Sequence, residues 1–241
     1  MKRLADISGG VFSVQRVANL EADRVAVAQS CRDKALFSRP RPNRVNPFGE
    51  FEAVPARGIL MGNRGDLHNA DGSIGRTWKL KRWISCTLHS PSGHRVTFDT
   101  PGRYTPLFFA DEVTALAAGH RPCAECRRVD YDRFRQGWQS AFGTQATAAE
   151  MDETLHQARI DRRGRKVTFE TQLSDLPPGV FVTMRDAPRA PFLWRDGHLF
   201  AWSHTGYGTP LFAKDHHTVT VLTPAPIVRI LTNNLPWHNG N

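Results

Sequence analysis

The hydrophobic positions of this chain follow two different periods. Across residues 111–158 they recur every three or four residues, which is the spacing of one face of a helix. From residue 162 onward they form short β-branched or aromatic runs, separated by glycine- and proline-containing turns. The pattern predicts an α+β fold whose C-terminal part is mostly strands.

Three helices are predicted in the first of these regions. Residues 111–118 begin with two acids and end before Gly119, a residue that can stop a helix in a left-handed conformation. A second helix begins near Cys126, and residues 145–158 form the third. The aromatic residues of the second helix recur at helical spacing and are expected in the core: Tyr131, Phe134, Trp138 and Phe142.

Strands are predicted on both sides of the helices. A strand from Trp78 to Leu88, a turn at residues 90–93 and a strand from His94 to Phe98 would form a β-hairpin. After the helices, the expected strands are residues 167–171, 180–184, 192–194, 199–202 and 218–222. A helical turn at residues 226–231 follows them.

The chain is expected to divide into three parts. Residues 1–50 form a peripheral segment, with a short amphipathic helix at 17–28 and a basic, proline-containing linker at 39–44. Residues 51–160 form an α+β domain, and residues 161–241 form a β-rich C-terminal domain. No internal repeat is evident.

The charge of the chain favours a polyanionic partner. Its 32 Lys and Arg exceed its 23 Asp and Glu, which gives a net charge of +9. Neutralising phosphates with such cations releases condensed counterions, so a polyanion such as nucleic acid is the expected partner. No run of about 18 apolar residues is present to span a membrane. The first residues carry an early acid and no apolar run, so we expect a cytoplasmic protein.

The four cysteines point to metal chemistry. Cys123 and Cys126 have the C-x2-C spacing that binds one tetrahedral Zn²⁺ from a single turn. They precede a predicted helix and the pair Arg127-Arg128, both of which favour the thiolate. A redox pair is the alternative, but no βαβ unit is evident around it.

A closed zinc site needs two further ligands. Cys86, on the predicted hairpin, is the expected third ligand, whereas Cys31 is expected to be a lone thiol. For the fourth ligand the order of preference is His94, His89 and His120. His94 leads because the turn of the hairpin would fold it back beside Cys86.

The sequence around the cysteine pair resembles two known families. Pro122-Cys123-Ala124-Glu125-Cys126 is similar to the end of the zinc deaminase signature, but the upstream H-x-E or C-x-E of that chemistry is missing. The longer stretch 108–126 resembles the metal-binding domain of the DNA-repair protein Ada, with its aromatic strand end, short helix, glycine and Arg-Pro-Cys-x-x-Cys.

The Ada resemblance covers about residues 86–128 and implies a zinc-binding β-hairpin and helix module that acts on DNA. In that family four cysteines bind the zinc, and one of them accepts a methyl group from a DNA phosphotriester. Cys123 and Cys126 match the second cysteine pair. Cys86 has no cysteine three or four residues away, which favours a Cys3His site that joins the hairpin to the helices.

Residues 57–68 are the best candidate for a second functional element. Their glycines suit tight turns or a close approach of backbone to ligand, and Arg57, Arg64 and His68 are suited to gripping a phosphate or a flipped base. Asn63, Arg64 and His68 are the candidate catalytic residues. A connection that only turns the chain is the alternative, since the phosphate-binding fingerprints are missing.

Further cations are predicted to contact nucleic acid. Residues 76–83 interleave cations with Trp78 and Trp83, one expected in the core and the other stacked on a base; a solvated edge strand is the alternative. The full set of predicted nucleic-acid contacts is Arg57, Arg64, Arg76, Trp78, Lys79, Lys81, Arg82, Arg127, Arg128, Arg163 and Arg165.

Three functions therefore compete. The first is a zinc-containing nucleic-acid-binding protein of DNA repair, modification or damage recognition. The second is a nucleic-acid-processing enzyme, such as a base-excising glycosylase or nuclease, with a structural zinc. The third is a deaminase-like enzyme, or a structural zinc protein without nucleic acid. The charge and the Ada resemblance favour the first two, and the length favours an enzymatic or damage-recognising activity.

Overall fold

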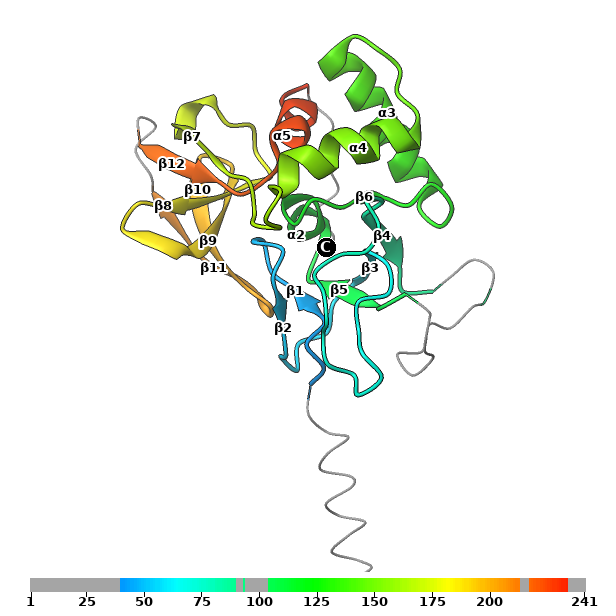
Figure 1. Ribbon diagram of the computed structural model, residues 1–241. Helices are drawn as coiled ribbons and strands as arrows, with labels where there is room; N and C mark the ends of the chain where they lie inside the picture. Colours follow the sequence, from blue (N-terminus) through cyan, green and yellow to red (C-terminus); the bar gives the residue numbers. More distant parts are fainter. Residues whose placement is uncertain (1–39, 90–92, 94–103, 213–216, 234–241) are drawn as a thin grey trace, which may run out of the picture. The chain divides into compact units, whose positions relative to one another are not determined.

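The computed structural model describes residues 40–89, 93, 104–212 and 217–233 (Figure 1). The chain divides after Pro40, and the described helices and strands all belong to the second unit, Arg41–Asn241. The helix predicted at 17–28 lies outside the described residues, as does the second arm of the predicted hairpin, His94 to Phe98.

The first sheet has six strands in the order β2-β1-β5-β3-β4-β6. Their bounds are β1 Arg44–Val45, β2 Phe51–Glu52, β3 Leu60–Asn63, β4 Ile84–Thr87, β5 Leu107–Phe109 and β6 Arg121–Pro122. Strand β4 pairs antiparallel with β3 and parallel with β6. The strand predicted from residue 78 is therefore shorter than expected, because only residues 84–87 of it enter the sheet.

The second sheet is an antiparallel set of six strands in the order β11-β10-β9-β8-β12-β7. Their bounds are β7 Phe169–Gln172, β8 Val180–Met184, β9 Ala187–Arg195, β10 His198–Ser203, β11 Gly206–Phe212 and β12 Thr218–Val221. Five of these strands match the predicted runs. Strand β11 was not predicted, because its glycines and proline are typical of a loop.

Four α-helices complete the described fold: α2 Glu112–Ala117, α3 Arg128–Phe142, α4 Ala148–Arg159 and α5 Ala225–Thr232. The three central helices and the C-terminal helical turn lie where the sequence predicts them, which confirms the α+β class. The Asp111 side chain accepts a hydrogen bond from Thr114 N and so caps α2. No helix in the described part of the chain is long and apolar enough to cross a membrane.

The largest core is shared by the central helices and the second sheet. Tyr131, Phe134 and Trp138 of α3 are buried there, as predicted, and Phe142 packs against them partly buried. Buried residues of α4, α5, β8, β9 and β12 belong to the same cluster. Helices α3, α4 and α5 accordingly lie together beside the second sheet (Figure 1).

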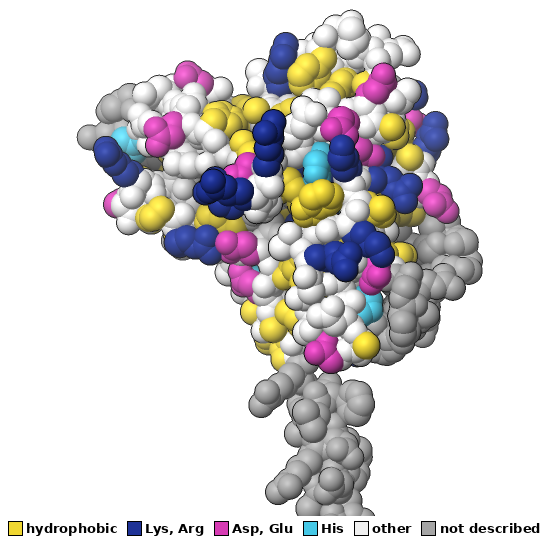
Figure 2. All heavy atoms as spheres, viewed as in Figure 1, with side chains coloured by type: hydrophobic (Ala, Val, Ile, Leu, Met, Phe, Trp, Pro, Cys, Tyr) yellow, Lys and Arg dark blue, Asp and Glu magenta, His cyan; other side chains and the backbone are white. Residues whose placement is uncertain are grey.

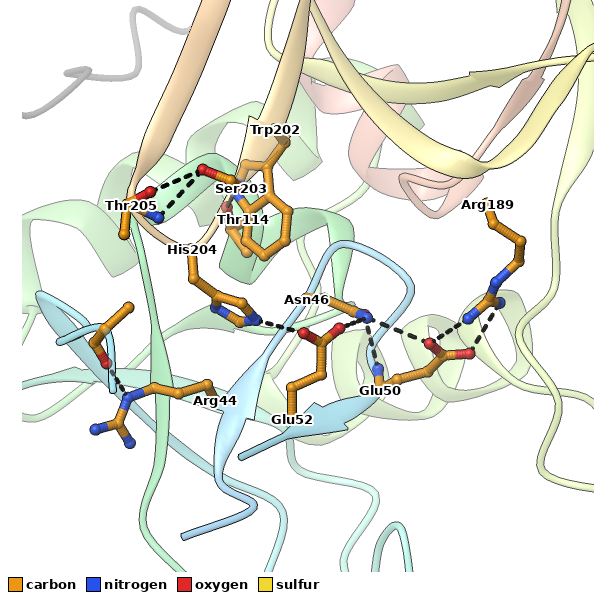
Figure 3. A network of polar contacts seen from close by, with 11 residues as sticks. Arg44, Asn46, Glu50, Glu52, Thr114, Arg189, Trp202, Ser203, His204 and Thr205 are labelled. Carbon is orange, nitrogen blue, oxygen red and sulfur yellow. Dashed lines mark hydrogen bonds and ion pairs between the residues drawn. The ribbon is translucent and has the colours of Figure 1, made fainter. Parts of the chain in front are cut away.

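A polar network joins the first sheet to strand β9 and to the turn between β10 and β11 (Figure 3). The His204 ring lies 3.0 Å from the Glu52 carboxylate, and Glu52 in turn accepts a hydrogen bond from Asn46. Glu50 accepts two hydrogen bonds from Arg189, at 3.0 and 2.7 Å. The network holds the edge of the first sheet against the second part of the chain.

Candidate metal centre

The parallel pairing of β4 with β6 brings together cysteines that are far apart in the sequence. Ile84 pairs with Arg121 and Ser85 with Pro122, so Cys86 and Cys123 are the next residues of the two strands. Cys123 N donates to Ser85 O at 2.9 Å, which continues the ladder. The chain then turns into α3 and returns Cys126, so that the Sγ atoms of the three cysteines lie within 4.8 Å of one another.

The three sulfurs fit a shared metal ion. In a tetrahedral thiolate site the metal–sulfur distance is about 2.3 Å, so neighbouring sulfurs lie roughly 3.8 Å apart. Glu125 N points at Cys123 Sγ at 3.5 Å, and such backbone donors stabilise a thiolate. A hydrogen bond from Cys86 lowers the pKa of Cys123 to about 5, whereas the pKa of Cys86 is raised by that same bond and by burial. The cluster thus offers one thiolate and two further soft ligands.

The fourth ligand is not among the described candidates. His94 lies outside the described residues, and neither His89 nor His120 belongs to the cluster. His120 is fully buried, with its ring near Phe109 and its Nε2 accepting from Arg64 Nε at 3.2 Å. Burial and the nearby Arg64 hold the pKa of His120 well below its usual value, which keeps it a neutral acceptor.

A pocket of about 400 Å³ opens beside the sulfurs. All three cysteines line it, together with Met61, Asn63, Arg82, Tyr104 and Glu125 among others. Asn63, a candidate catalytic residue, is thereby placed next to the metal-binding cluster. Its Oδ1 accepts a hydrogen bond from Gly65 N at 2.8 Å, which fixes the side chain.

The other candidates from the glycine-rich segment lie elsewhere. Arg64 is buried, with 1% of its surface exposed, and lines a different cavity. The His68 ring contacts Thr105 Oγ1 at 2.6 Å. Gly58 and Gly62 serve packing, because a Cβ atom on either would lie 2.5 Å from an atom of Phe109. The glycines of this segment thus allow β5 to approach closely.

Two buried arginines position the turn that carries the cysteines, and sequence reasoning missed this role. Arg127 donates to Ser85 Oγ, to Glu112 Oε1 and to Asp130 Oδ2, which ties the turn to β4, α2 and α3. Arg121 forms a two-bond ion pair with Asp152 of α4, at 2.9 and 2.8 Å. The sequence indicated this role only by the position of the two arginines, one just before and one just after the cysteine pair. Their partners Glu112 and Asp152 are distant in sequence.

Most of the predicted nucleic-acid contacts are exposed. The exposed cations are Arg57, Arg76, Lys79, Lys81, Arg82, Arg128, Arg163 and Arg165, whereas Arg64 and Arg127 are buried. Trp83 is buried, and Trp78 is half-buried with its ring 4.5 Å from that of His156. Figure 2 shows Lys and Arg side chains gathered over the middle of one face, with acidic and hydrophobic side chains between them.

Arg82 links the metal-side pocket to an open groove. The groove has a volume of about 590 Å³ and runs between residues 80–82 and helix α4. Arg82 and Ala148 line both the groove and the pocket beside the cysteines, so the two hollows are neighbours. Four of the exposed cations form no ion pair within the described residues: Arg57, Arg76, Arg82 and Arg163.

No protein-family model, no curated protein and no solved structure matches this chain at a significant level.

Proposed function

We propose that this chain is a zinc-containing nucleic-acid-binding protein that acts in DNA repair or DNA modification. The observation that carries the proposal is the cluster of three cysteine sulfurs within 4.8 Å, beside a pocket that shares the exposed Arg82 with a groove whose charged lining is Lys81, Arg82, Asp152 and Glu153. Three soft sulfur ligands within 4.8 Å of one another suit zinc, and the net charge of +9 suits a polyanion.

Cys86, Cys123 and Cys126 would hold the zinc. Bound there, the ion supplies a cross-link between β4 and the start of α3, and Lewis acidity at its fourth position. The protein contributes the preformed turn, which Arg127 holds by its bonds to Ser85, Glu112 and Asp130. The Ada resemblance supports the same ligands, because Cys123 and Cys126 match its second cysteine pair.

The nucleic acid is proposed to lie along the groove beside α4. Arg82 stands where the groove meets the pocket, exposed and without an ion-pair partner in the described part of the chain. Unpaired cations contribute more to phosphate binding than paired ones, because no internal bond has to break first. Lys81 is available at the same groove, although it is paired with Glu153 at 2.6 Å.

A second candidate is a nucleic-acid-processing enzyme, such as a base-excising glycosylase or a nuclease. One observation favours it: the sulfurs line a pocket of about 400 Å³ instead of being sealed in a core. A pocket of that volume is typical of small-ligand sites. Asn63 and Glu125 provide an amide and a carboxylate at its wall.

The test is a binding and turnover assay with labelled single- and double-stranded DNA at low and moderate salt. We expect binding at low salt that weakens as salt rises, and weaker binding still for Arg82→Ala. Arg185→Ala, an exposed cation on the β8–β9 turn, is the matched control and should bind as the wild type does. Absence of binding at low salt contradicts the proposal. A changed DNA product favours the enzyme.

A further inference from the structure

A second cavity lies on the opposite face of strands β3 and β4 from the cysteine cluster. Side chains alternate along a strand. Met61, Asn63, Ile84 and Cys86 line the metal-side pocket, and the next positions, Arg64 and Trp83, line the second cavity. This cavity has a volume of about 350 Å³. Its other walls come from residues 48–50, the end of α4 and the turn 164–166.

The lining of this cavity is strongly cationic. Arg64 and Arg159 are each only 1% exposed, and Lys166 stands beside them. Two more cations, Arg165 and Arg189, lie at its wall. The single carboxylate in the described lining is Glu50, which is already bound by Arg189 at 3.0 and 2.7 Å. Arg165 is likewise paired, with Asp161 at 2.7 Å, so the excess positive charge of the cavity comes from Arg64, Arg159 and Lys166.

The two buried guanidiniums are held apart by an indole ring. The guanidinium carbon of Arg64 lies 3.8 Å from the centre of the Trp83 ring, and that of Arg159 lies 4.1 Å from it. Phe51 also contacts Arg64, at 4.8 Å. Backbone carbonyls accept some of their donors: Gly49 O from Arg64 Nη1 at 3.0 Å, and Gly119 O from Arg159 Nη1 at 2.9 Å. The cations are thus rigidly placed before any ligand arrives.

Two of the buried donors have no acceptor among the described residues: Arg64 Nη2 and Arg159 Nε. A buried charged donor without a partner is costly, and buried cations are usually paired with an anion. Neither guanidinium forms an ion pair with a described carboxylate. Arg121, by contrast, has its full pair with Asp152. The charge and the open donors of this cavity are therefore unsatisfied by the protein itself.

We propose that this cavity binds a phosphate monoester, with Arg64, Arg159 and Lys166 as its binding residues. Fixed guanidinium donors and an ammonium group are the groups that recognise phosphoryl oxygens. A dianion neutralises more of this charge than a carboxylate does. The ester is carried either by a free nucleotide or by the end of a nucleic-acid strand. The inference requires neither zinc nor the DNA groove.

The ionisation of Lys166 gives the site a pH dependence. Burial and the nearby Arg64 lower the pKa of Lys166 to about 7, while Glu50 opposes them and Arg159 reinforces them. The other charged groups that line the cavity are Arg165 and Arg189, and neutral His120 contacts Arg64. A bound anion favours the protonated amine. For an anion whose own charge does not change over this range, binding should therefore be tighter one unit below the Lys166 pKa of about 7 than one unit above it.

Calorimetry and thermal unfolding with inorganic phosphate at millimolar concentration test the site in the full-length protein. We expect a rise in Tm and measurable binding for the wild type. Lys166→Met should weaken phosphate binding by about tenfold and remove the contribution of the amine to its pH dependence, leaving only that of the phosphate itself. Arg185→Met, which removes an exposed cation on the β8–β9 turn outside the cavity, should change neither. Arg64→Lys serves as a second variant that keeps the charge but loses the guanidinium, and it should also bind more weakly.

Adenosine monophosphate and a matched pair of oligonucleotides, 5′-phosphorylated and 5′-hydroxyl, identify the source of the ester. Tight binding of the mononucleotide points to a free ester, and a preference for the 5′-phosphorylated strand points to a strand end. Arg82→Ala should retain phosphate binding, which separates this site from the proposed DNA groove. No binding of any of these phosphates by the folded wild type would overturn the proposal, as would unchanged binding by Lys166→Met and Arg64→Lys.

Discussion

Four arginines among the described residues are buried, in two kinds of environment. Arg121 pairs with Asp152 and Arg127 with Glu112, whereas Arg64 and Arg159 stack on Trp83. Burial of a charge is expensive unless it is compensated. The first two arginines are compensated within the protein and serve to position the cysteine turn. The other two keep open donors, which is why they are assigned to a ligand.

The cysteine cluster gives a direct prediction at the residue scale. Cys123→Ser removes one of the three clustered sulfurs, so bound zinc should fall from about one equivalent to a small fraction of it. Metal analysis after desalting measures the change, and Tm should fall with it. Cys31→Ser is the matched control, because Cys31 is predicted to be a lone thiol. Undiminished zinc in Cys123→Ser would contradict the assignment.

The Arg121–Asp152 pair is predicted to matter far more than a surface pair. Asp152→Ala leaves the buried guanidinium of Arg121 without its partner, which should cost about 3–5 kcal/mol of unfolding free energy. Asp132→Ala breaks a pair with Arg128, whose side chain is 63% exposed, and should cost within about 1 kcal/mol. Urea denaturation measures both. Equal losses of unfolding free energy in the two variants would contradict the prediction that burial makes the Arg121–Asp152 pair more important than the exposed pair.

At the scale of elements, the turn after α2 decides where the cysteines lie. Gly119 has a φ of +86°, and a Cβ atom there would lie 2.6 Å from Arg159 Cδ. A side chain at this position would therefore be strained and would also displace the guanidinium of the second cavity. Gly119 ends the helix, as the sequence indicates. It also leaves space for the side chain of Arg159, 40 positions later, and no local sequence pattern indicates that contact.

Gly119→Ala should therefore destabilise the protein more than Gly143→Ala does. Gly143 has a comparable φ of +72°, but a Cβ atom there meets nothing within 4 Å. The control should cost about 1–2 kcal/mol from the left-handed backbone alone, and Gly119→Ala should exceed it because of the clash. Thermal and urea unfolding compare the two variants. A smaller effect at Gly119 would mean that Arg159 moves freely.

The segment before β4 shows why strand boundaries were partly misplaced. Its alternation of cations and aromatics resembles a strand, yet Lys79 N and Leu80 N donate to Arg64 O, at 2.9 and 3.0 Å. The chain folds back onto Arg64 instead of extending, and Trp83 Nε1 donates to Leu80 O. The bonds to Arg64 join residues 15 and 16 positions apart, so the periodicity of the segment does not indicate them.

At the scale of the whole molecule, the shared core predicts cooperative unfolding. The boundary expected near residue 160 stays a prediction, but α3 and α4 share one hydrophobic cluster with the second sheet. We expect a single transition, with tryptophan fluorescence and circular dichroism coinciding. Phe134→Ala, which empties a fully buried site, should shift that whole transition by about 3–5 kcal/mol. Two separate transitions would instead favour independent domains.

The two candidate sites use opposite faces of one sheet. The cysteine cluster lies on one side of β3 and β4, and the cationic cavity on the other. A change of one residue in register would exchange the two sets of side chains. The packing of Gly62 against Phe109 resists such a slip, because only a glycine fits against that ring. The register of the sheet therefore determines which side chains reach the cysteine cluster and which reach the cationic cavity.

The sequence by itself determined what depends on neighbouring residues. Helical spacing located the aromatic core residues of α3, glycine marked the end of α2, and the C-x2-C spacing identified Cys123 and Cys126. The third cysteine was also chosen correctly for the cluster, because few cysteines were available. Local rules suffice here, since caps, turns and helix faces are made by residues within a few positions of each other.

Tertiary structure alone decided which cations face solvent and which face each other. Arg57 and Arg64 are equivalent as sequence signals, yet one is exposed and the other is buried against Trp83. Whether such a side chain is exposed or buried depends on segments that are distant in sequence, here Arg159 and the turn at residues 164–166. The spacing of charged residues along the sequence does not indicate which of them are buried. A long cationic side chain can reach either water or a cavity from the same backbone position.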